Sequence, residues 1–349
     1  MTTFPPLPNT NYCLDLPGFA IGHGSDLWGK TGVTVILCPQ GAVACAELRG
    51  SATGTRQFDS LISPNHVASR AHAVVLAGGS GFGLDAATPV VDHLAQRGIG
   101  FRTGVRPVPL VPTAILFDLA FGSAEAVPTA ALVSEAIRTA EGMSTSSQLQ
   151  RGSVGAGTGA TVGKVLGPER AMKGGFGFAS LTTPTGVTVA AAVAVNAFGD
   201  VRDPGTNQLI AGCRLDPSSL ELVDAGRVLA ALQPGKEDPW EGNTTLAAVL
   251  TDAALTKTEL SKVCQMAFGG FYRALKPALS LFDGDLVVAL SSAKKEASVN
   301  QVGFLAEQAV AEAIVDGVRS ADGFGILPAA RDLQPLGKPR NLETEKQRP

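Results

Sequence analysis

The alternation of apolar and polar runs in the first half of the chain predicts strands and helices in turn. Residues 31–39 and 41–48 are β-like runs on either side of a Pro-Gln-Gly turn, so we expect two strands there. Residues 72–98 begin as an apolar strand, pass a glycine turn and continue with apolar side chains at helical spacing. Residues 114–121 indicate another strand, and residues 128–142 a helix with Pro near its start and Gly at its end.

The second half repeats this alternation around a polar interruption. Residues 186–195 are almost entirely Val and Ala and lead into Asn196, which predicts a buried strand. Residues 235–242 are polar and rich in turn formers, so we expect an exposed linker there. Beyond this linker, the pattern predicts two more strands and a helix, over residues 244–252, 285–291 and 302–318. The whole order is typical of an α/β protein.

One further helix has a clear start. Thr256 and Glu259 have the spacing of a capping box, in which the two side chains satisfy backbone N–H groups at a helix N-terminus. The apolar face of this helix consists of Leu260, Val263, Cys264, Ala267 and Phe271. From about residue 338 the chain is polar, and we expect a disordered tail.

Composition and charge narrow the class of protein. Hydrophobic residues make up 45% of the 349 residues and charged residues 17%, which excludes a disordered chain. The net charge is −3 and no basic stripe is present, so we expect no nucleic-acid partner. The longest apolar run, residues 187–195, is far shorter than the ~20 residues that a membrane span needs. The N-terminus lacks the features of a signal peptide, so we expect a cytoplasmic protein without a membrane partner.

Several familiar motifs fail on inspection. Lys164 follows a glycine-rich stretch, but Thr158 and Val165 stand where a phosphate-binding loop requires Gly and a hydroxyl residue. Phe82 occupies the position of the second Gly of a nucleophile elbow around Ser80. The four His and five Cys residues show no metal-ligand spacing, so we expect no metal and free thiols.

The most informative segment is Gly242-Asn243-Thr244-Thr245, where the polar linker meets a strand. A threonine whose own backbone amine is free carries a nucleophile and its base in one residue. An α-amino group has a pKa of about 7.7–8.0, so a fair fraction is neutral at pH 7 and accepts the hydroxyl proton. This chemistry requires the Asn243–Thr244 peptide to be broken. The residues alone leave open the simpler interpretation, a strand that begins with Thr.

Eight sequence segments, this one included, are in register over more than 270 residues and resemble the P1 peptidases, peptidase family S58. This family includes L-aminopeptidase/D-esterases, β-peptidyl aminopeptidases and nylon-oligomer endohydrolases. The matching segments are residues 15–18 with 21–23, 31–35, 76–84, 102–104, 155–164, 195–196, 242–245 and 283–285.

The resemblance implies a four-layer α/β/β/α sandwich like that of N-terminal-nucleophile hydrolases. It also implies that the precursor cuts itself before Thr244, which gives an α chain of residues 1–243 and a β chain of residues 244–349. The processed pairs are then expected to assemble into a homotetramer. No cofactor is expected, because nucleophile, base and oxyanion donor are all protein groups.

The resemblance also implies roles for individual residues. Thr244 is the nucleophile, and Asn196 at a strand end donates to the oxyanion. Lys164 is the cation near the nucleophile, while Asp283 and Asp285 orient its amine and hydroxyl. The implied substrate-binding residues are Gly78, Gly79, Phe82 and Phe117.

Phe117 departs from the family, since many members have Tyr there and Phe cannot donate a hydrogen bond. The expected activity is hydrolysis of small peptides or aminoacyl amides. Alternatives are an endo-acting amidase on linear ω-amino-acid oligomers, an acyltransferase similar to ornithine acetyltransferase, and an inactive scaffold or binding protein.

Overall fold

A computed structural model describes residues 9–143, 148–232 and 242–333. The polar tail expected from about residue 338 lies outside these ranges, as does the linker over 235–242 apart from Gly242. The largest sheet has nine strands in the order β3-β5-β4-β2-β14-β12-β9-β8, with β1 paired to β2. Its strands are β1 (Ala20–Asp26), β2 (Thr31–Leu48), β3 (Thr55–Arg56), β4 (Arg70–Ala77), β5 (Thr113–Ile115), β8 (Gly175–Thr182), β9 (Thr188–Asn196), β12 (Thr244–Ala253) and β14 (Leu286–Lys295).

The remaining elements flank this sheet. Two small sheets contain β6 (Thr161–Val162) with β7 (Met172–Lys173), and β10 (Asp200–Arg202) with β11 (Leu209–Ala211) and β13 (Leu275–Lys276). The α-helices are α1 (Asp59–Ile62), α2 (Ala87–Gln96), α3 (Ala130–Glu141), α4 (Ala225–Ala231), α5 (Lys257–Ala274) and α6 (Val299–Arg319). Short 3-10 turns are η1 (Ser80–Ala86), η2 (Gly155–Gly157), η3 (Pro168–Arg170) and η4 (Ala330–Asp332).

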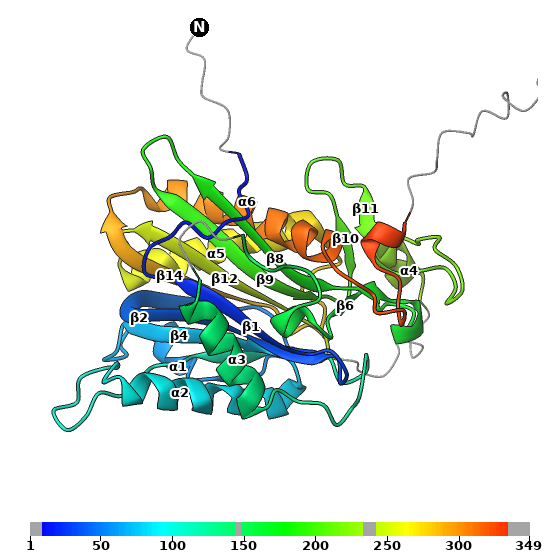
Figure 1. The fold of residues 1–349 in the computed structure, drawn as a ribbon. Coiled ribbons are helices and arrows are strands. Elements are labelled where there is room, and N and C mark those ends of the chain that lie inside the picture. The colour runs from blue at the N-terminus through cyan, green and yellow to red at the C-terminus, as the bar shows by residue number, and fades with distance from the viewer. Residues whose placement is uncertain (1–8, 144–147, 233–241, 334–349) are drawn as a thin grey trace, which may run out of the picture.

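Alternating side chains divide the core into three apolar layers. In β12, Leu246, Ala248 and Leu250 face a central layer between two halves of the strand system. The intervening Ala247 and Val249 pack toward α5 and α6. A third layer lies between α2, α3 and the first strands. Figure 1 shows α5 and α6 on one side of the strands and α2 and α3 on the other, which gives the expected α/β/β/α sandwich.

Strand β2 connects the two halves, and here the sequence interpretation was wrong. The two strands expected over 31–39 and 41–48 form one continuous strand. Its pairing with β4 shifts register between Leu37 and Ala42, where Gly41 has a φ of +80°. The Pro-Gln-Gly sequence therefore bends a strand at an irregularity in its pairing instead of reversing the chain.

Other predicted elements are confirmed, with one exception. The capping box of Thr256 and Glu259 is present at the start of α5. The strand expected over 114–121 ends at Ile115. Beyond it, the Asp118 carboxylate accepts hydrogen bonds from the Gly79 N–H at 2.6 Å and the Thr31 hydroxyl at 2.8 Å. These contacts hold the chain away from an extended course.

All five cysteines are free thiols, as expected. Four of them are buried and Cys13 is half-buried. Within the described ranges, no helix combines the length and the apolar character that crossing a lipid bilayer requires.

Candidate active site

Thr244 is the first residue of β12, which lies between β9 and β14. Asn196, the last residue of β9, is its direct partner in the antiparallel pairing. On the other side, a Cβ placed on Gly284 would lie 2.6 Å from the Thr244 hydroxyl oxygen. The absence of a side chain at Gly284 therefore makes room for the Thr244 hydroxyl, and the Thr244 side chain is buried between these neighbours.

Asn243, the residue before Thr244, is held by the segment that leads into β14. The Asn243 carbonyl oxygen accepts a hydrogen bond from the Gly284 N–H at 2.7 Å, and the Asn243 N–H donates to Phe282 O at 3.0 Å. The Thr244 hydroxyl also donates to the Asn243 carbonyl oxygen. The nucleophile expected from the sequence thus lies directly beside the carbonyl group of the peptide bond that would have to be cut.

The carboxamide of Asn196 is fixed at both ends. Its Oδ1 accepts hydrogen bonds from the Thr161 N–H and from Lys164 Nζ, each at 2.9 Å. Its Nδ2 donates to the Phe117 carbonyl oxygen at 2.8 Å. Since Oδ1 is occupied by two donors, the NH2 group is the end directed toward other acceptors, as an oxyanion donor requires.

Lys164 brings a positive charge into this largely buried region. Its ammonium group donates to Oδ1 and, at 3.3 Å, to the backbone carbonyl of Asn196. The residue is only 8% exposed. The family resemblance implied that Lys164, Asn196 and Thr244 act together, and the structure brings them into one cluster.

Asp283 and Asp285 lie on the β14 side of Thr244. Asp285 Oδ1 accepts the Thr245 N–H at 2.6 Å. Asp283 accepts the Ser280 hydroxyl at 2.6 Å and the Phe198 N–H at 3.2 Å. Asp285 thus fixes the backbone next to the nucleophile, and Asp283 links residue 280 to the chain beyond β9. Their expected action on a free Thr244 amine stays a prediction.

The environment of the two aspartates disfavours their charged form. Burial, with the nearby Asp283 charge as the next contribution, raises the pKa of Asp285 well above its usual range. Burial also raises the pKa of Asp283, although its hydrogen bonds and the Lys164 charge act in the opposite direction. A buried carboxyl pair next to a nucleophile is a common feature of sites that move protons.

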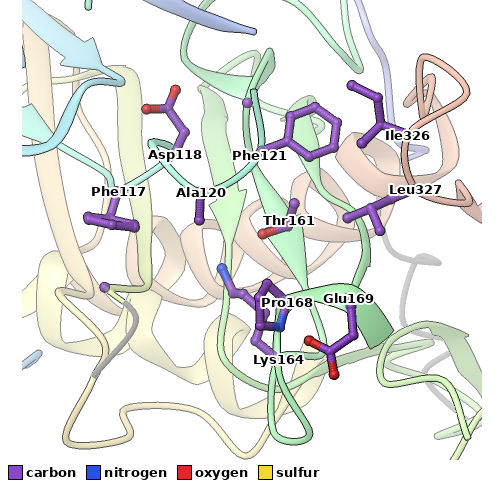
Figure 2. Close-up of a pocket in the computed structure, with 12 residues that line it drawn as sticks. Phe117, Asp118, Ala120, Phe121, Thr161, Lys164, Pro168, Glu169, Ile326 and Leu327 are labelled. Carbon is purple, nitrogen blue, oxygen red and sulfur yellow. The ribbon is translucent and has the colours of Figure 1, made fainter. Parts of the chain in front are cut away.

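A cavity of about 270 Å³ opens beside this cluster, and Figure 2 shows the side chains around it. Gly242, two residues before Thr244, lines the cavity together with Lys164. A second cavity of about 700 Å³ shares three of its lining residues, so the two are adjacent. The other lining residues of the first cavity are Phe117, Asp118, Ala120, Phe121, Gly159, Thr161, Pro168, Glu169, Ile326 and Leu327.

The four residues expected to bind substrate do not all lie at the cavity. Phe117 lines the cavity, whereas Gly78, Gly79 and Phe82 are not among its lining residues, and the role of all four in substrate binding stays a prediction. Gly79 donates its N–H to Asp118, and a Cβ on Gly78 would lie 2.1 Å from an oxygen of that carboxylate. Phe82 is 68% exposed in η1. Gly78 therefore allows the Asp118 loop to approach, whereas a Cβ on Gly79 would lie 2.9 Å from Pro128.

Sequence reasoning missed three residues of the cavity or its support. Asp118 and Thr161 line the cavity, and the Thr161 N–H binds Asn196. Glu169 contributes a carboxylate at the junction of the two cavities. The only available signal was an acidic residue inside the apolar run over 114–121, at Asp118.

Comparison with known proteins identifies the class to which this fold and site belong. The sequence model of peptidase family S58 matches residues 11–326. The chain therefore belongs to peptidase family S58 and is a hydrolase of peptide or amide bonds.

Similar proteins carry names from two branches. The chain is 34% identical to an uncharacterized aminopeptidase of Mycobacterium leprae, over 91% of this chain and 92% of that protein. It is 29% identical to the 6-aminohexanoate-oligomer endohydrolase of Paenarthrobacter ureafaciens, over 80% of this chain and 74% of that protein.

Solved structures share the fold. An L-aminopeptidase D-Ala-esterase/amidase from Ochrobactrum anthropi, described as a variant of the Ntn hydrolase fold, superposes with a TM-score of 0.66 at 16% identity. That match covers 92% of this chain and 89% of the other. A β-aminopeptidase from Burkholderia superposes with a TM-score of 0.65 at 19% identity, over 91% of this chain and 89% of the other.

Proposed function

We propose that the chain cuts itself between Asn243 and Thr244 and then uses the new N-terminal Thr244 to hydrolyse amide bonds of small peptides or aminoacyl amides. The observation that carries this proposal is the position of the Thr244 hydroxyl. It lies beside the Asn243 carbonyl, whose oxygen already accepts the Gly284 N–H. The products are the α chain of residues 1–243 and the β chain of residues 244–349.

The cut begins with attack of Thr244 Oγ1 on the carbonyl carbon of Asn243. The hydroxyl proton passes to the amide nitrogen of Thr244, the C–N bond breaks, and an ester forms between Asn243 and the hydroxyl oxygen. The Gly284 N–H stabilises the negative charge that develops on the Asn243 oxygen. The Thr244 amine is free once the C–N bond breaks, and water then hydrolyses the ester, which releases the Asn243 carboxylate and restores the Thr244 hydroxyl.

Turnover uses the same hydroxyl on an external amide. The free Thr244 amine accepts the hydroxyl proton, Oγ1 bonds to the substrate carbonyl carbon, and the leaving amine takes the proton as the C–N bond breaks. One N–H of Asn196 Nδ2 keeps its bond to Phe117 O, and the second N–H donates to the developing oxyanion. The nearby Lys164 charge favours the neutral form of the amine. Water then releases the acyl group from Thr244.

The cavity favours a substrate with an apolar body. Phe117, Phe121 and Leu327 supply apolar wall, while Lys164 and Glu169 supply opposite charges at different places. An aminopeptidase substrate carries a free ammonium group, for which Glu169 is the solvent-exposed carboxylate of the lining. The mycobacterial relatives named as aminopeptidases support this choice.

A second candidate function is endo-acting hydrolysis of linear ω-amino-acid oligomers. The relatives named 6-aminohexanoate-oligomer endohydrolase favour it, as does the adjacent second cavity, which leaves room for a longer chain. Product analysis separates the two candidates. Release of single N-terminal residues supports the aminopeptidase, and internal fragments from an end-blocked oligomer support the endo-acting amidase.

The first test is the intact mass of the denatured protein. We expect two fragments from the wild type, the smaller beginning at Thr244, and one full-length chain from Thr244→Ala. Thr244→Ser is the matched control, since it keeps a hydroxyl and is expected to process. An uncut wild type that is inert toward aminoacyl amides would contradict the proposal and favour an inactive scaffold. Light scattering of the processed protein tests the predicted tetramer.

A further inference from the structure

Lys173 is a completely buried cation that the proposed reaction does not use. It belongs to β7 and has 0% of its surface exposed. Its ammonium group donates to three backbone carbonyls, those of Gly157 at 2.8 Å, Ala160 at 2.7 Å and Gly174 at 3.1 Å. These bonds hold the glycine-rich segment that carries Thr161 into the cavity wall.

One of these carbonyls leads directly to Asn196. The C=O of Ala160 and the N–H of Thr161 belong to the same planar peptide group. Lys173 binds the oxygen of this peptide group, and the N–H of the same group donates to Asn196 Oδ1 at 2.9 Å. A cation on the oxygen of a peptide fixes the plane of the group and strengthens its N–H as a donor.

The other end of the Asn196 carboxamide is reached through Asp118. Asn196 Nδ2 donates to the carbonyl oxygen of Phe117, which belongs to the peptide between Phe117 and Asp118. The Asp118 carboxylate anchors this peptide through its bonds to the Thr31 hydroxyl and the Gly79 N–H. Lys173 and Asp118 thus each hold one of the two peptides that grip Asn196.

The two charges also act on each other. Burial raises the pKa of Asp118 to about 6, an effect that the Lys173 charge opposes. Burial lowers the pKa of Lys173 to about 7, and the Asp118 charge opposes this shift. Removal of either charge therefore leaves the other buried with less compensation.

We propose that Lys173 and Asp118 are positioning residues of the active site, which aim Asn196 Nδ2 by fixing the peptides at both ends of its carboxamide. This inference rests on the proposed function, in which Nδ2 donates to the developing oxyanion. A residue that only supports the loop would lower stability, whereas a residue that acts through Asn196 lowers kcat and loses its effect once the Asn196 carboxamide is gone.

The test is a double-mutant cycle, measured with an aminoacyl amide substrate on the processed protein that contains both chains. We expect Lys173→Met to lower kcat by about tenfold to a hundredfold while KM changes by less than about threefold. In an Asn196→Ala background, the same substitution is expected to change kcat by less than about threefold. Equal losses in both backgrounds, or an effect on KM alone, would overturn the inference.

Two further variants keep this test decisive. Lys257 also binds two backbone carbonyls through its ammonium, those of Ser60 at 2.7 Å and Ser63 at 2.5 Å, so Lys257→Met is the matched control and should leave kcat unchanged. If Lys173→Met does not fold, Asp118→Asn takes its place in the cycle with the same expectation.

If Asn196→Ala alone leaves kcat intact, the oxyanion role in the proposed function fails. If only the cycle is additive, the positioning role fails and the proposed function stands.

Discussion

The two strands that flank Thr244 present opposite chemistry. On the β9 side lie hydrogen-bond donors and a positive charge, with Asn196 held by Lys164 and by the Thr161 N–H. On the β14 side lie two buried carboxylates, Asp283 and Asp285. Donors stabilise an oxyanion, whereas carboxylates hold backbone N–H groups and attract an ammonium. On this asymmetry we expect the acyl oxygen of an external substrate on the β9 side and the Thr244 amine on the β14 side. The Asn243 oxygen of the uncut chain, by contrast, is bound from the β14 side by the Gly284 N–H.

The largest effect is expected from removing the Thr244 hydroxyl, which lies between the β9 side and the β14 side. Thr244→Ala leaves no hydroxyl for either reaction, so we expect no cut and no hydrolysis. Denaturing mass spectrometry and an aminoacyl amide assay measure both. If this variant is still cut after residue 243, another residue is the nucleophile, and the comparison of the two strands around Thr244 does not describe the active site.

Asn196→Ala tests the β9 side. Loss of one oxyanion donor lowers kcat by about 10²–10³ in comparable sites, and we expect a loss in that range with KM little changed. Steady-state kinetics of the processed enzyme measure it. Unchanged kcat would show that the acyl oxygen does not lie on the β9 side.

Gly284→Ala tests the space on the β14 side. An added Cβ would lie 2.6 Å from the Thr244 hydroxyl oxygen and 2.5 Å from Ala52 O, so the nucleophile or the backbone must shift. We expect slower self-cleavage and a stability loss of about 1–3 kcal/mol. Gly81→Ala serves as the control, since a Cβ there has no neighbour within 4 Å. Processing at the wild-type rate would contradict the close fit.

Asp285→Asn tests the charge on the β14 side through its pH dependence. The folded-state pKa of Asp285 is raised, so its contribution to stability is greatest below the unfolded value of about 3.9 and is lost as pH rises. The Tm of Asp285→Asn relative to wild type should therefore increase from pH 4 to pH 7. Thermal unfolding at several pH values measures this difference in Tm. A difference that shrinks as pH rises would contradict the raised pKa of Asp285.

The smallest effect concerns Glu169 at the junction of the two cavities. Pairing between exposed charges is weak, so Glu169→Gln should raise KM for substrates with a free ammonium by about twofold to fivefold. The same variant should leave KM unchanged for N-acetylated substrates. Competition kinetics with such a pair of substrates measure the contrast, and equal effects on both would remove Glu169 from substrate recognition.

Local patterns in the sequence predicted local structure well. The Val/Ala run before Asn196 and the capping box at Thr256 became β9 and α5, because both depend on neighbouring residues. The bend in β2 was not predictable in the same way. A Pro-Gln-Gly sequence is typical of a chain reversal, and only the two sheet halves that β2 joins keep it extended.

The site required more than local patterns. The pairing of Thr244 with Asn196 joins distant segments, and no periodicity encodes it; the expectation came from the family resemblance. Lys173 and Asp118 were missed as functional residues because a charged side chain in a sequence indicates a surface position. Their burial depends on backbone carbonyls and N–H groups supplied by other segments.

The strand order has a consequence for how the cut protein would refold. β12 and β14 belong to the part after residue 243, yet β12 pairs with β9 and β14 pairs with β2 from the part before it. The two pieces would therefore share one continuous sheet and stay together. Once unfolded, they would have to find each other in solution, so recovery after heating would depend on protein concentration after the cut and be independent of it before. Self-cleavage would turn the folding of one chain into the association of two.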